Sequence, residues 1–178
     1  FIPLTVGGGV SKLKDIERLL ESGADKVSIN TSAILDPSLV GSAAKKFGSQ
    51  CIVVAVDSKR EGEKSYVYTH GGKNKTAFET SAWIKIVEGE GAGEILLTSM
   101  DRDGTKMGFD NELTSSISKD LSIPLITSGG AGSIDHMIEG ISDGKADAVL
   151  AASIFHQKEI TIAEVKEGLA SKGIEVRL

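Results

Sequence analysis

The sequence has 178 residues, of which 40% are hydrophobic and 4% aromatic, and its 21 glycines suit α/β architecture. Its formal net charge of −5 argues against a nucleic-acid-binding surface, which needs clustered lysines and arginines. No signal peptide is visible in this sequence, and no hydrophobic run comes near the roughly 20 residues needed to cross a bilayer. Cys51 has no second cysteine with which to form a disulfide, so we expect a soluble, cytoplasmic protein without membrane association.

Short apolar runs alternate with amphipathic helical patterns along the chain. Core strands are predicted at residues 2–6, 26–29, 51–56, 94–98, 123–127 and 147–151. Helices are predicted at residues 12–22, 37–47, 79–90, 111–120, 134–142 and 162–171, and a hairpin strand at 65–69. Six βα units in alternation predict a parallel α/β sheet with right-handed crossovers, either open or closed into a barrel.

An internal repeat favours the barrel. Residues 5–11 (TVGGGVS) lie over residues 127–133 (TSGGAGS) when the chain is shifted by 122 positions without gaps. The copies begin on the first and fifth predicted core strands, four units apart, which is half a turn of an eight-stranded barrel. We therefore predict a (β/α)8 TIM barrel of which about six βα units, strands 3–8, are present. Residues 1–178 would form a single incomplete domain that lacks the first two βα units.

Both copies of the repeat have the features of a phosphate-binding corner. Paired glycines at a strand end let backbone N–H groups approach an anion, since no Cβ intervenes. The next strand ends in Asn30-Thr31 in one copy and in Ala152-Ser153 in the other, which supply hydroxyls and a helix N-terminus. Two such sites across one barrel mouth predict an elongated bisphosphate substrate. The alternative is that the glycines only form tight βα turns.

Two further segments carry acidic residues at the predicted barrel mouth. Asp57 ends the most hydrophobic strand, where catalytic residues of this fold lie, so general acid–base work is expected of it. Pairing with Lys59 or Arg60, or capping a turn, is the alternative. Asp103-Gly104 follows the fourth core strand and is either a simple turn or a ligand contact.

The histidines carry less information. His70, His136 and His156 show no metal-ligand spacing and have no cysteine or carboxylate companions. The sequence therefore predicts neither a metal site nor a cofactor, and it leaves the roles of the three histidines open.

Several longer strings resemble one enzyme family. They are TVGGG (5–9), ADKVSINT (24–31), GAGEILLTSMDRDGT (91–105), SGGAG (128–132) and LAASIFH (150–156). Their order and spacing resemble the cyclase subunit of imidazole glycerol phosphate synthase over the length of the chain. The resemblance implies a lyase of histidine biosynthesis. That enzyme adds ammonia from a glutaminase partner to a ribulosyl intermediate with two phosphates, and it releases imidazole glycerol phosphate and aminoimidazole carboxamide ribotide.

The resemblance also implies roles for matching residues. Asp57 would be one of two catalytic aspartates, the other lying on the missing first strand. The substrate and its phosphates would contact Gly9, Asn30, Thr31, Thr98, Asp103, Gly104, Ser128, Gly129, Gly130, Ala152 and Ser153. The glutaminase would dock at the opposite barrel face, where ammonia enters a channel, through Asp25, Lys26, Gln50 and Glu94. Ordinary solvation of charges at strand starts is the alternative for this last group.

Two other functions remain open. The sister isomerase of the same pathway is also a two-phosphate barrel, but the strings DRDGT (101–105) and YTHGG (68–72) favour the cyclase. A non-catalytic phosphate-binding fragment follows if 178 residues are the natural chain. We expect the 178-residue chain alone to be inactive, since it lacks the second aspartate.

Overall fold

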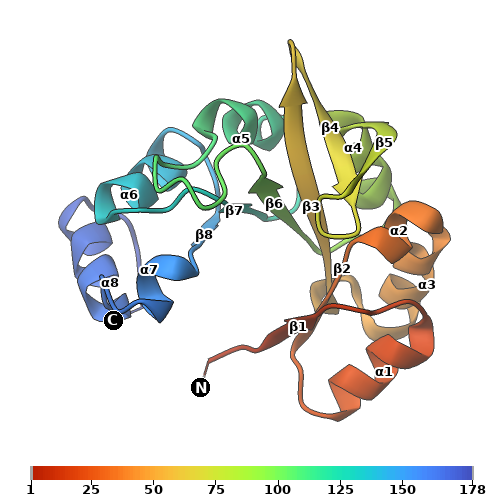
Figure 1. Cartoon of the computed structure of the whole chain (residues 1–178). Helices are drawn as coiled ribbons and strands as arrows, with labels where there is room; N and C mark the ends of the chain where they lie inside the picture. Colours follow the sequence, from red (N-terminus) through yellow and green to blue (C-terminus); the bar gives the residue numbers. More distant parts are fainter. Residues whose placement is uncertain (1, 178) are drawn as a thin grey trace. The chain divides into compact units, whose positions relative to one another are not determined.

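The computed structural model describes residues 2–177, so Phe1 and Leu178, the two ends of the predicted domain, lie outside the described residues. The chain divides into two compact units, Phe1–Leu96 and Leu97–Leu178, and the elements of each can be followed in Figure 1. The strand β6 (Glu94–Ser99) ends the first unit and begins the second.

The first unit is a parallel sheet with strand order β1-β2-β3-β6. Its strands are β1 (Thr5–Gly7), β2 (Lys26–Ile29) and β3 (Ile52–Glu61), with β6 at one side. Its helices are α1 (Leu13–Glu21), α2 (Thr31–Leu35), α3 (Ser38–Phe47) and α4 (Thr80–Glu90), with a short 3₁₀ helix at Ser49–Cys51. Parallel pairing places Val6 beside Val27 and Val27 beside Ile52. These are β-branched residues, which suit a parallel sheet that is buried on both faces.

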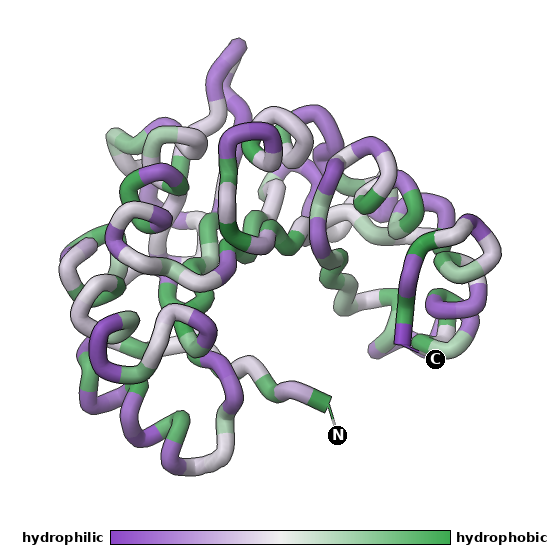
Figure 2. The backbone as a smooth tube through the Cα atoms, turned by 180° about the vertical axis from the view of Figure 1, so that it is seen from behind, coloured by the Kyte–Doolittle hydropathy of each residue, from purple (hydrophilic) through white to green (hydrophobic). Residues whose placement is uncertain are grey.

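The strand β3 continues beyond the parallel sheet as a hairpin. From Asp57 onward it pairs antiparallel with β4 (Lys64–Thr69), and β4 pairs with β5 (Asn74–Glu79). The turn between β3 and β4 uses Gly62 at φ +63°. Figure 2 shows this tip as a hydrophilic projection, which agrees with its charged sequence. The sequence predicted β4, but it predicted neither β5 nor the extension of β3.

An aromatic pair packs the helix α4 against the strand β5 in the first unit. Trp83 on α4 is fully buried, and its ring lies 5.0 Å from that of Phe78, with the ring planes tilted by 41°. Cys51 corrects a sequence expectation. It ends the 3₁₀ helix and is half-buried, so the core strand begins one residue later, at Ile52.

The second unit has the strand order β6-β7-β8. Its further elements are α5 (Asn111–Ser118), β7 (Leu125–Ser128), α6 (Ile134–Ser142), β8 (Ala148–Leu150), α7 (Ser153–His156) and α8 (Ile162–Ser171). The helices begin where side chains cap them. Asp110 accepts a hydrogen bond from the Leu113 N–H, and Thr161 forms a capping box with Glu164. Both α6 and α8 occupy the ranges predicted from sequence.

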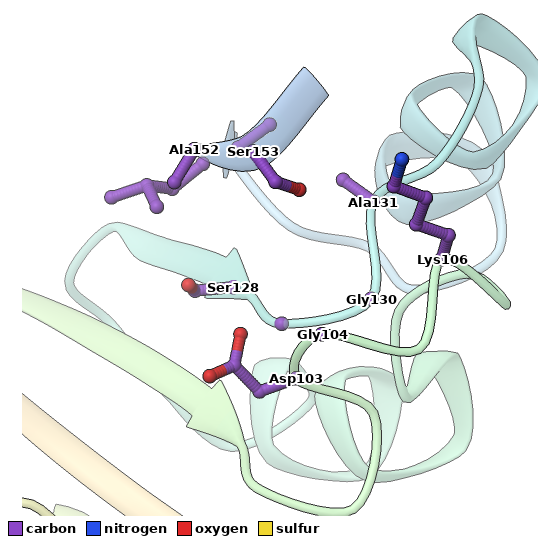
Figure 3. A pocket seen from close by; sticks show the side chains of 11 residues that line it. Asp103, Gly104, Lys106, Ser128, Gly130, Ala131, Ala152 and Ser153 are labelled. Carbon is purple, nitrogen blue, oxygen red and sulfur yellow. The ribbon is translucent and has the colours of Figure 1, made fainter. Parts of the chain in front are cut away.

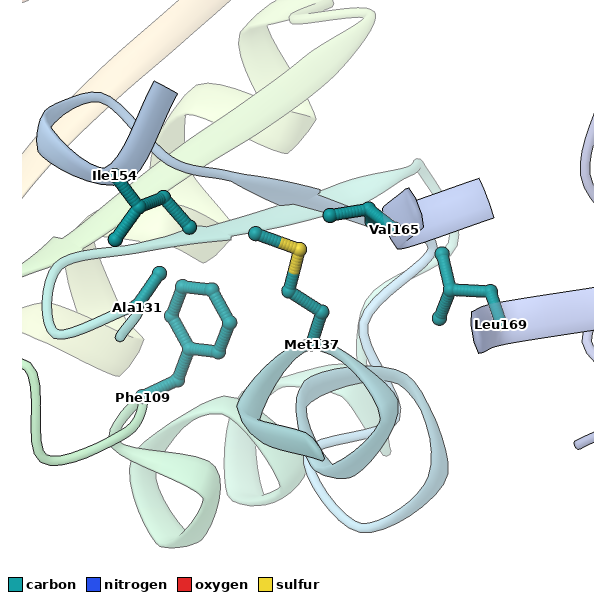
Figure 4. Packing of buried hydrophobic residues seen from close by; sticks show 6 residues of the cluster. All are labelled: Phe109, Ala131, Met137, Ile154, Val165 and Leu169. Carbon is teal, nitrogen blue, oxygen red and sulfur yellow. The ribbon is translucent and has the colours of Figure 1, made fainter. Parts of the chain in front are cut away.

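A compact hydrophobic cluster holds the helices of the second unit together. It contains Phe109, Ala131, Met137, Ile154, Val165 and Leu169, shown in Figure 4. Met137 comes from α6, Ile154 from α7, and Val165 and Leu169 from α8. The cluster therefore fixes the short helix α7, whose first residue belongs to the site described below.

The two units contain the internal repeat, but its register differs from the gapless alignment. The nine-residue helices α1 and α6 match at a shift of 121 positions, as do their buried residues Ile16 and Met137. Asp25 and Asp147 match at 122, and each accepts a hydrogen bond from the backbone N–H of Leu4 or Leu125, at 2.7 and 2.9 Å. The second copy thus contains one added residue before its carboxylate, in the turn where Lys145 adopts φ +56°.

The protein therefore has a parallel α/β fold built from βα units, consistent with part of a (β/α)8 TIM barrel as predicted. Within residues 2–177, no helix combines the length and the hydrophobicity that a membrane span requires.

Candidate functional site

The first pocket lies at the carboxyl ends of the strands of the first unit and has a volume of about 500 Å³. Residues from four segments line it: Gly8, Gly9, Val10, Ser11, Ser28, Ile29, Asn30, Thr31, Ser32, Leu35, Ala55, Asp57, His70 and Gly71. Four of them, Gly9, Asn30, Thr31 and Asp57, are residues that the sequence predicted. The size falls within the range of small-molecule sites.

Asp57 reaches this pocket because of strand alternation. Ala55 and Asp57 point to one face of β3, while Val56 and Ser58 are buried on the other. The Asp57 carboxylate accepts a hydrogen bond of 3.0 Å from the side-chain amide of Asn30. The amide oxygen of Asn30 is buried and has no hydrogen-bond partner among the described residues. A buried acceptor without a partner is costly, so this oxygen suits a donor group on a polar ligand.

The turn between β4 and β5 borders one side of the first pocket. His70 lies between β4 and β5 at φ +56°, and its backbone N–H donates to the Thr31 hydroxyl at 3.1 Å. That bond uses a lone pair of the Thr31 oxygen and leaves its hydroxyl hydrogen able to donate to a ligand. His70 Nδ1 also lies 3.0 Å from the Thr69 hydroxyl. Sequence patterns alone did not predict that His70 and Gly71 line the pocket.

The charged residues of the same hairpin are engaged with one another. Lys75 donates to Glu61 and lies 3.9 Å from the centre of the Tyr66 ring. The Lys75 ammonium, together with the Tyr68 hydroxyl, holds the pKa of the Glu61 carboxyl below its usual range. Lys75 is therefore part of the hairpin's own charge network.

The second pocket lies at the carboxyl ends of β7 and β8 and has a volume of about 130 Å³. Its lining comes from three segments of the second unit: Asp103, Gly104, Lys106, Ser128, Gly129, Gly130, Ala131, Leu150, Ala151, Ala152 and Ser153 (Figure 3). Seven of these are residues that the sequence predicted: Asp103, Gly104, Ser128, Gly129, Gly130, Ala152 and Ser153. Lys106 was not predicted, because nothing in the local sequence shows where its long side chain reaches.

Both pockets contain a pair of glycines in the left-handed region. Gly8 and Gly9 have φ of +97° and +69°, and Gly129 and Gly130 have φ of +92° and +99°. A Cβ on Gly9 would meet no atom of the described residues within 4 Å, whereas one on Gly130 would lie 2.2 Å from the Gly108 carbonyl oxygen. The glycines of the second pocket therefore also permit close packing of the loop that follows β6.

His136 supports the second glycine loop from behind. Its ring Nδ1 accepts a hydrogen bond of 3.2 Å from the Gly132 backbone N–H. The backbone N–H of His136 donates to the Ser133 hydroxyl. A Cβ on Gly108 would lie 3.3 Å from the same ring. His136 thus positions two loops that meet at the pocket.

The residues expected at the opposite strand ends are found there. Lys26 begins β2, Glu94 begins β6, and the two form a partly buried ion pair. Lys26 shares a face of its strand with Ser28, a lining residue of the first pocket, two positions along. Asp25 accepts the hydrogen bond from Leu4, and Gln50 is exposed on the 3₁₀ helix before β3.

Two further residues that the sequence analysis named are not among the described residues that line either pocket: Thr98, a predicted substrate contact, and His156, whose role was left open. Thr98 is partly buried on β6. His156 is exposed at the end of α7. In the part of the chain that the structure describes, no group of three or more His, Cys, Asp or Glu side chains is arranged to hold a metal ion.

Parallel strands with polar pockets at their carboxyl ends define this chain as an α/β protein of the class whose ligands bind at that edge. The sequence model of a family described as "Histidine biosynthesis protein" matches residues 1–161, and the chain belongs to that family. It is therefore a histidine biosynthesis protein of the isomerase or cyclase type.

The packing of Gly130 gives a test of the second pocket, with Gly9 as the matched control. Alanine at either position adopts an unfavourable φ, at a cost of about 1 kcal/mol in unfolding free energy. Only Gly130→Ala also displaces the Gly108 carbonyl, which should cost about 1–3 kcal/mol more. Urea unfolding of the two variants measures the difference. Equal losses would show that backbone conformation, and not close packing, explains both glycines.

Proposed function

We propose that this chain is the cyclase subunit of imidazole glycerol phosphate synthase. The observation that carries the proposal is the location of the two strings that favour a cyclase over an isomerase. His70 and Gly71 of the YTHGG string line the first pocket, and Asp103 and Gly104 of the DRDGT string line the second. Residues of the two strings that we expect to distinguish the cyclase thus line the two pockets.

The proposed substrate has a phosphate at each end, and each pocket takes one of them. In the first pocket, Gly9, the Thr31 hydroxyl and the start of α2 receive one phosphate. In the second, Gly104, Gly130 and the Ser153 hydroxyl at the start of α7 receive the other. Backbone N–H groups at glycine corners and helix starts are suited to anions because they donate without bringing a Cβ into contact. The pockets' hydroxyl-rich lining supports this assignment.

Asp57 is the proposed general acid–base of the reaction. Addition of ammonia followed by ring closure requires protons to leave nitrogen and to reach the departing groups, and a carboxylate within hydrogen-bonding reach can carry them. The Asn30 amide orients the Asp57 carboxylate, and Asp57 lines the first pocket. We further propose a second aspartate on a preceding βα unit, which the barrel implied by the repeat would supply.

The nitrogen comes, in this proposal, from a glutaminase subunit docked at the amino-terminal strand ends. Lys26 and Glu94 are half-buried there, with side-chain exposures of 28% and 17%, and they neutralise each other. An intact ion pair can flank a channel entrance without an uncompensated charge, whereas removing one partner leaves the other partly buried and unpaired. Asp25 and Gln50 would belong to the same docking face.

The first prediction concerns catalysis. Asp57→Asn is nearly isosteric, so the fold should persist. Imidazole glycerol phosphate formation from the bisphosphate intermediate should fall at least about a thousandfold, whether ammonia or glutamine is supplied. The assay follows absorbance with the chain completed by the two βα units that the repeat predicts. Activity within tenfold of the parent would remove Asp57 from catalysis.

The same assay with the isomerase's substrate separates the two candidate functions. The unaltered enzyme should turn over the cyclase substrate with ammonia and leave the isomerase substrate unchanged. Turnover of only the isomerase substrate would replace the proposed function with the isomerase.

The second prediction concerns ammonia delivery. Lys26→Met and Glu94→Gln should each lower glutamine-dependent turnover about tenfold or more, while turnover with added ammonium salt changes less than about twofold. Lys46→Met, which breaks the surface ion pair with Glu17, is the matched control and should change neither. Equal losses with the two nitrogen sources would contradict a role at a channel entrance.

A further inference from the structure

The second pocket has a charge arrangement that the phosphate assignment does not use. Among the described residues that line it, Asp103 and Lys106 are the ionisable ones. The Lys106 ammonium forms an ion pair with Glu159 and lies 3.4 Å from the side-chain oxygen of Gln157. Lys106 therefore lines the pocket (Figure 3), but its ammonium is paired with Glu159 and lies near Gln157, both after α7.

The base of Lys106 is fixed. Its backbone has φ +57°, and Gly132 lacks the Cβ that would otherwise lie 2.5 Å from the Lys106 carbonyl oxygen. The next residues are held as well, because the Gly108 N–H donates to the Gly130 carbonyl at 2.8 Å. Only the four-carbon stem of the side chain remains to move the ammonium between partners.

The acceptors of Lys106 are also fixed to the pocket wall. The Gln157 N–H donates to the Ser153 carbonyl at 2.8 Å, and the Glu159 N–H donates to the Ile154 carbonyl at 2.9 Å. Ser153 itself lines the pocket. The Lys106–Glu159 pair therefore links one lining segment of the second pocket to the residues that follow another, at positions 150–153.

Charge balance decides what this pair does when a phosphate arrives. A phosphate group near pH 7 carries a charge of about −1.5 to −2. With Lys106 paired to Glu159, the phosphate would meet the Asp103 carboxylate, and no other cationic side chain is among the described residues that line the pocket. The Lys106 and Glu159 side chains are 40% and 38% exposed, and ion pairs of such exposure contribute little to stability. The ammonium can therefore exchange this carboxylate for a phosphate at low cost.

We infer that Lys106 is an exchangeable phosphate ligand of the second pocket and that Glu159, assisted by Gln157, is its resting partner. Phosphate binding moves the ammonium from Glu159 to the phosphate oxygens. Glu159 is then a positioning residue that lowers phosphate affinity by competing for Lys106. This inference rests on the proposed function, in that it takes the second pocket to be a phosphate site.

The test is titration of the 178-residue chain with inorganic phosphate, followed by NMR of its backbone amides. The amides of Gly129, Gly130 and Ser153 report the second pocket, and those of Gly9 and Thr31 report the first as an internal control. Glu159→Gln should tighten phosphate binding at the second pocket by about threefold, because it removes the competing carboxylate. Lys106→Gln should weaken it by at least about fivefold, and Lys106→Arg should largely retain it.

Two controls separate exchange from a general charge effect. Glu17→Gln removes the acidic partner of Lys46, a pair of comparable exposure that lines neither pocket, and changes the net charge equally. It should leave the second-pocket amides unaffected. In the Lys106→Gln background, Glu159→Gln should give no further tightening. Thermal unfolding of each variant shows that the fold persists.

The possible results have distinct meanings. If Glu159→Gln has as little effect as Glu17→Gln, or if it tightens phosphate binding even in the Lys106→Gln background, then Lys106 does not exchange between Glu159 and phosphate. The phosphate site itself would still stand. If saturating phosphate leaves the second-pocket amides of the unaltered chain unshifted, then the phosphate site fails, and the exchange fails with it.

Discussion

Both pockets depend on a pair of glycines that follow a parallel strand in the left-handed region. With φ between +69° and +99°, Gly8-Gly9 and Gly129-Gly130 turn the chain sharply at the strand end. Residues with a Cβ adopt such values only with strain. The turn brings the backbone beside the start of the short helix that follows the neighbouring strand. This helix is α2 after β2 in one unit and α7 after β8 in the other. Each pocket is therefore a consequence of one backbone constraint, repeated.

The same corner has been adapted differently in the two units. The first pocket is about 500 Å³, bordered by a hairpin that carries His70 and by the carboxylate of Asp57. The second is about 130 Å³, because the loop after β6 packs onto Gly129 and Gly130. In the proposed function this difference separates the roles, with the acid–base group beside the larger pocket and a tight anion site in the smaller one.

Sequence patterns predicted the six core strands and the six longer helices, since strand ends and glycine corners leave local signals. Of the substrate residues that the sequence and the family resemblance predicted, all but Thr98 line one of the two pockets, and their contact with a substrate stays a prediction. The helices α2 and α7 have five and four residues, too few for a helical period to show. The first part of the repeat, from the glycines through the helix, was aligned one residue off because Gly7, Gly8 and Gly9 allow two alignments with a pair of glycines. The alignment of Asp25 with Asp147 was right. Lys106 and His70 could not be assigned to pockets, because each is itself a non-glycine residue in the left-handed region, which local sequence does not signal.

The central claim is that one chain carries two phosphate sites, each built on a glycine corner. A crystal structure determined in the presence of phosphate tests it most directly. The account predicts one anion in each pocket, the first contacting Gly9 and Thr31 and the second contacting Gly130 and Ser153. Pockets that hold no ordered anion at a saturating phosphate concentration would contradict it.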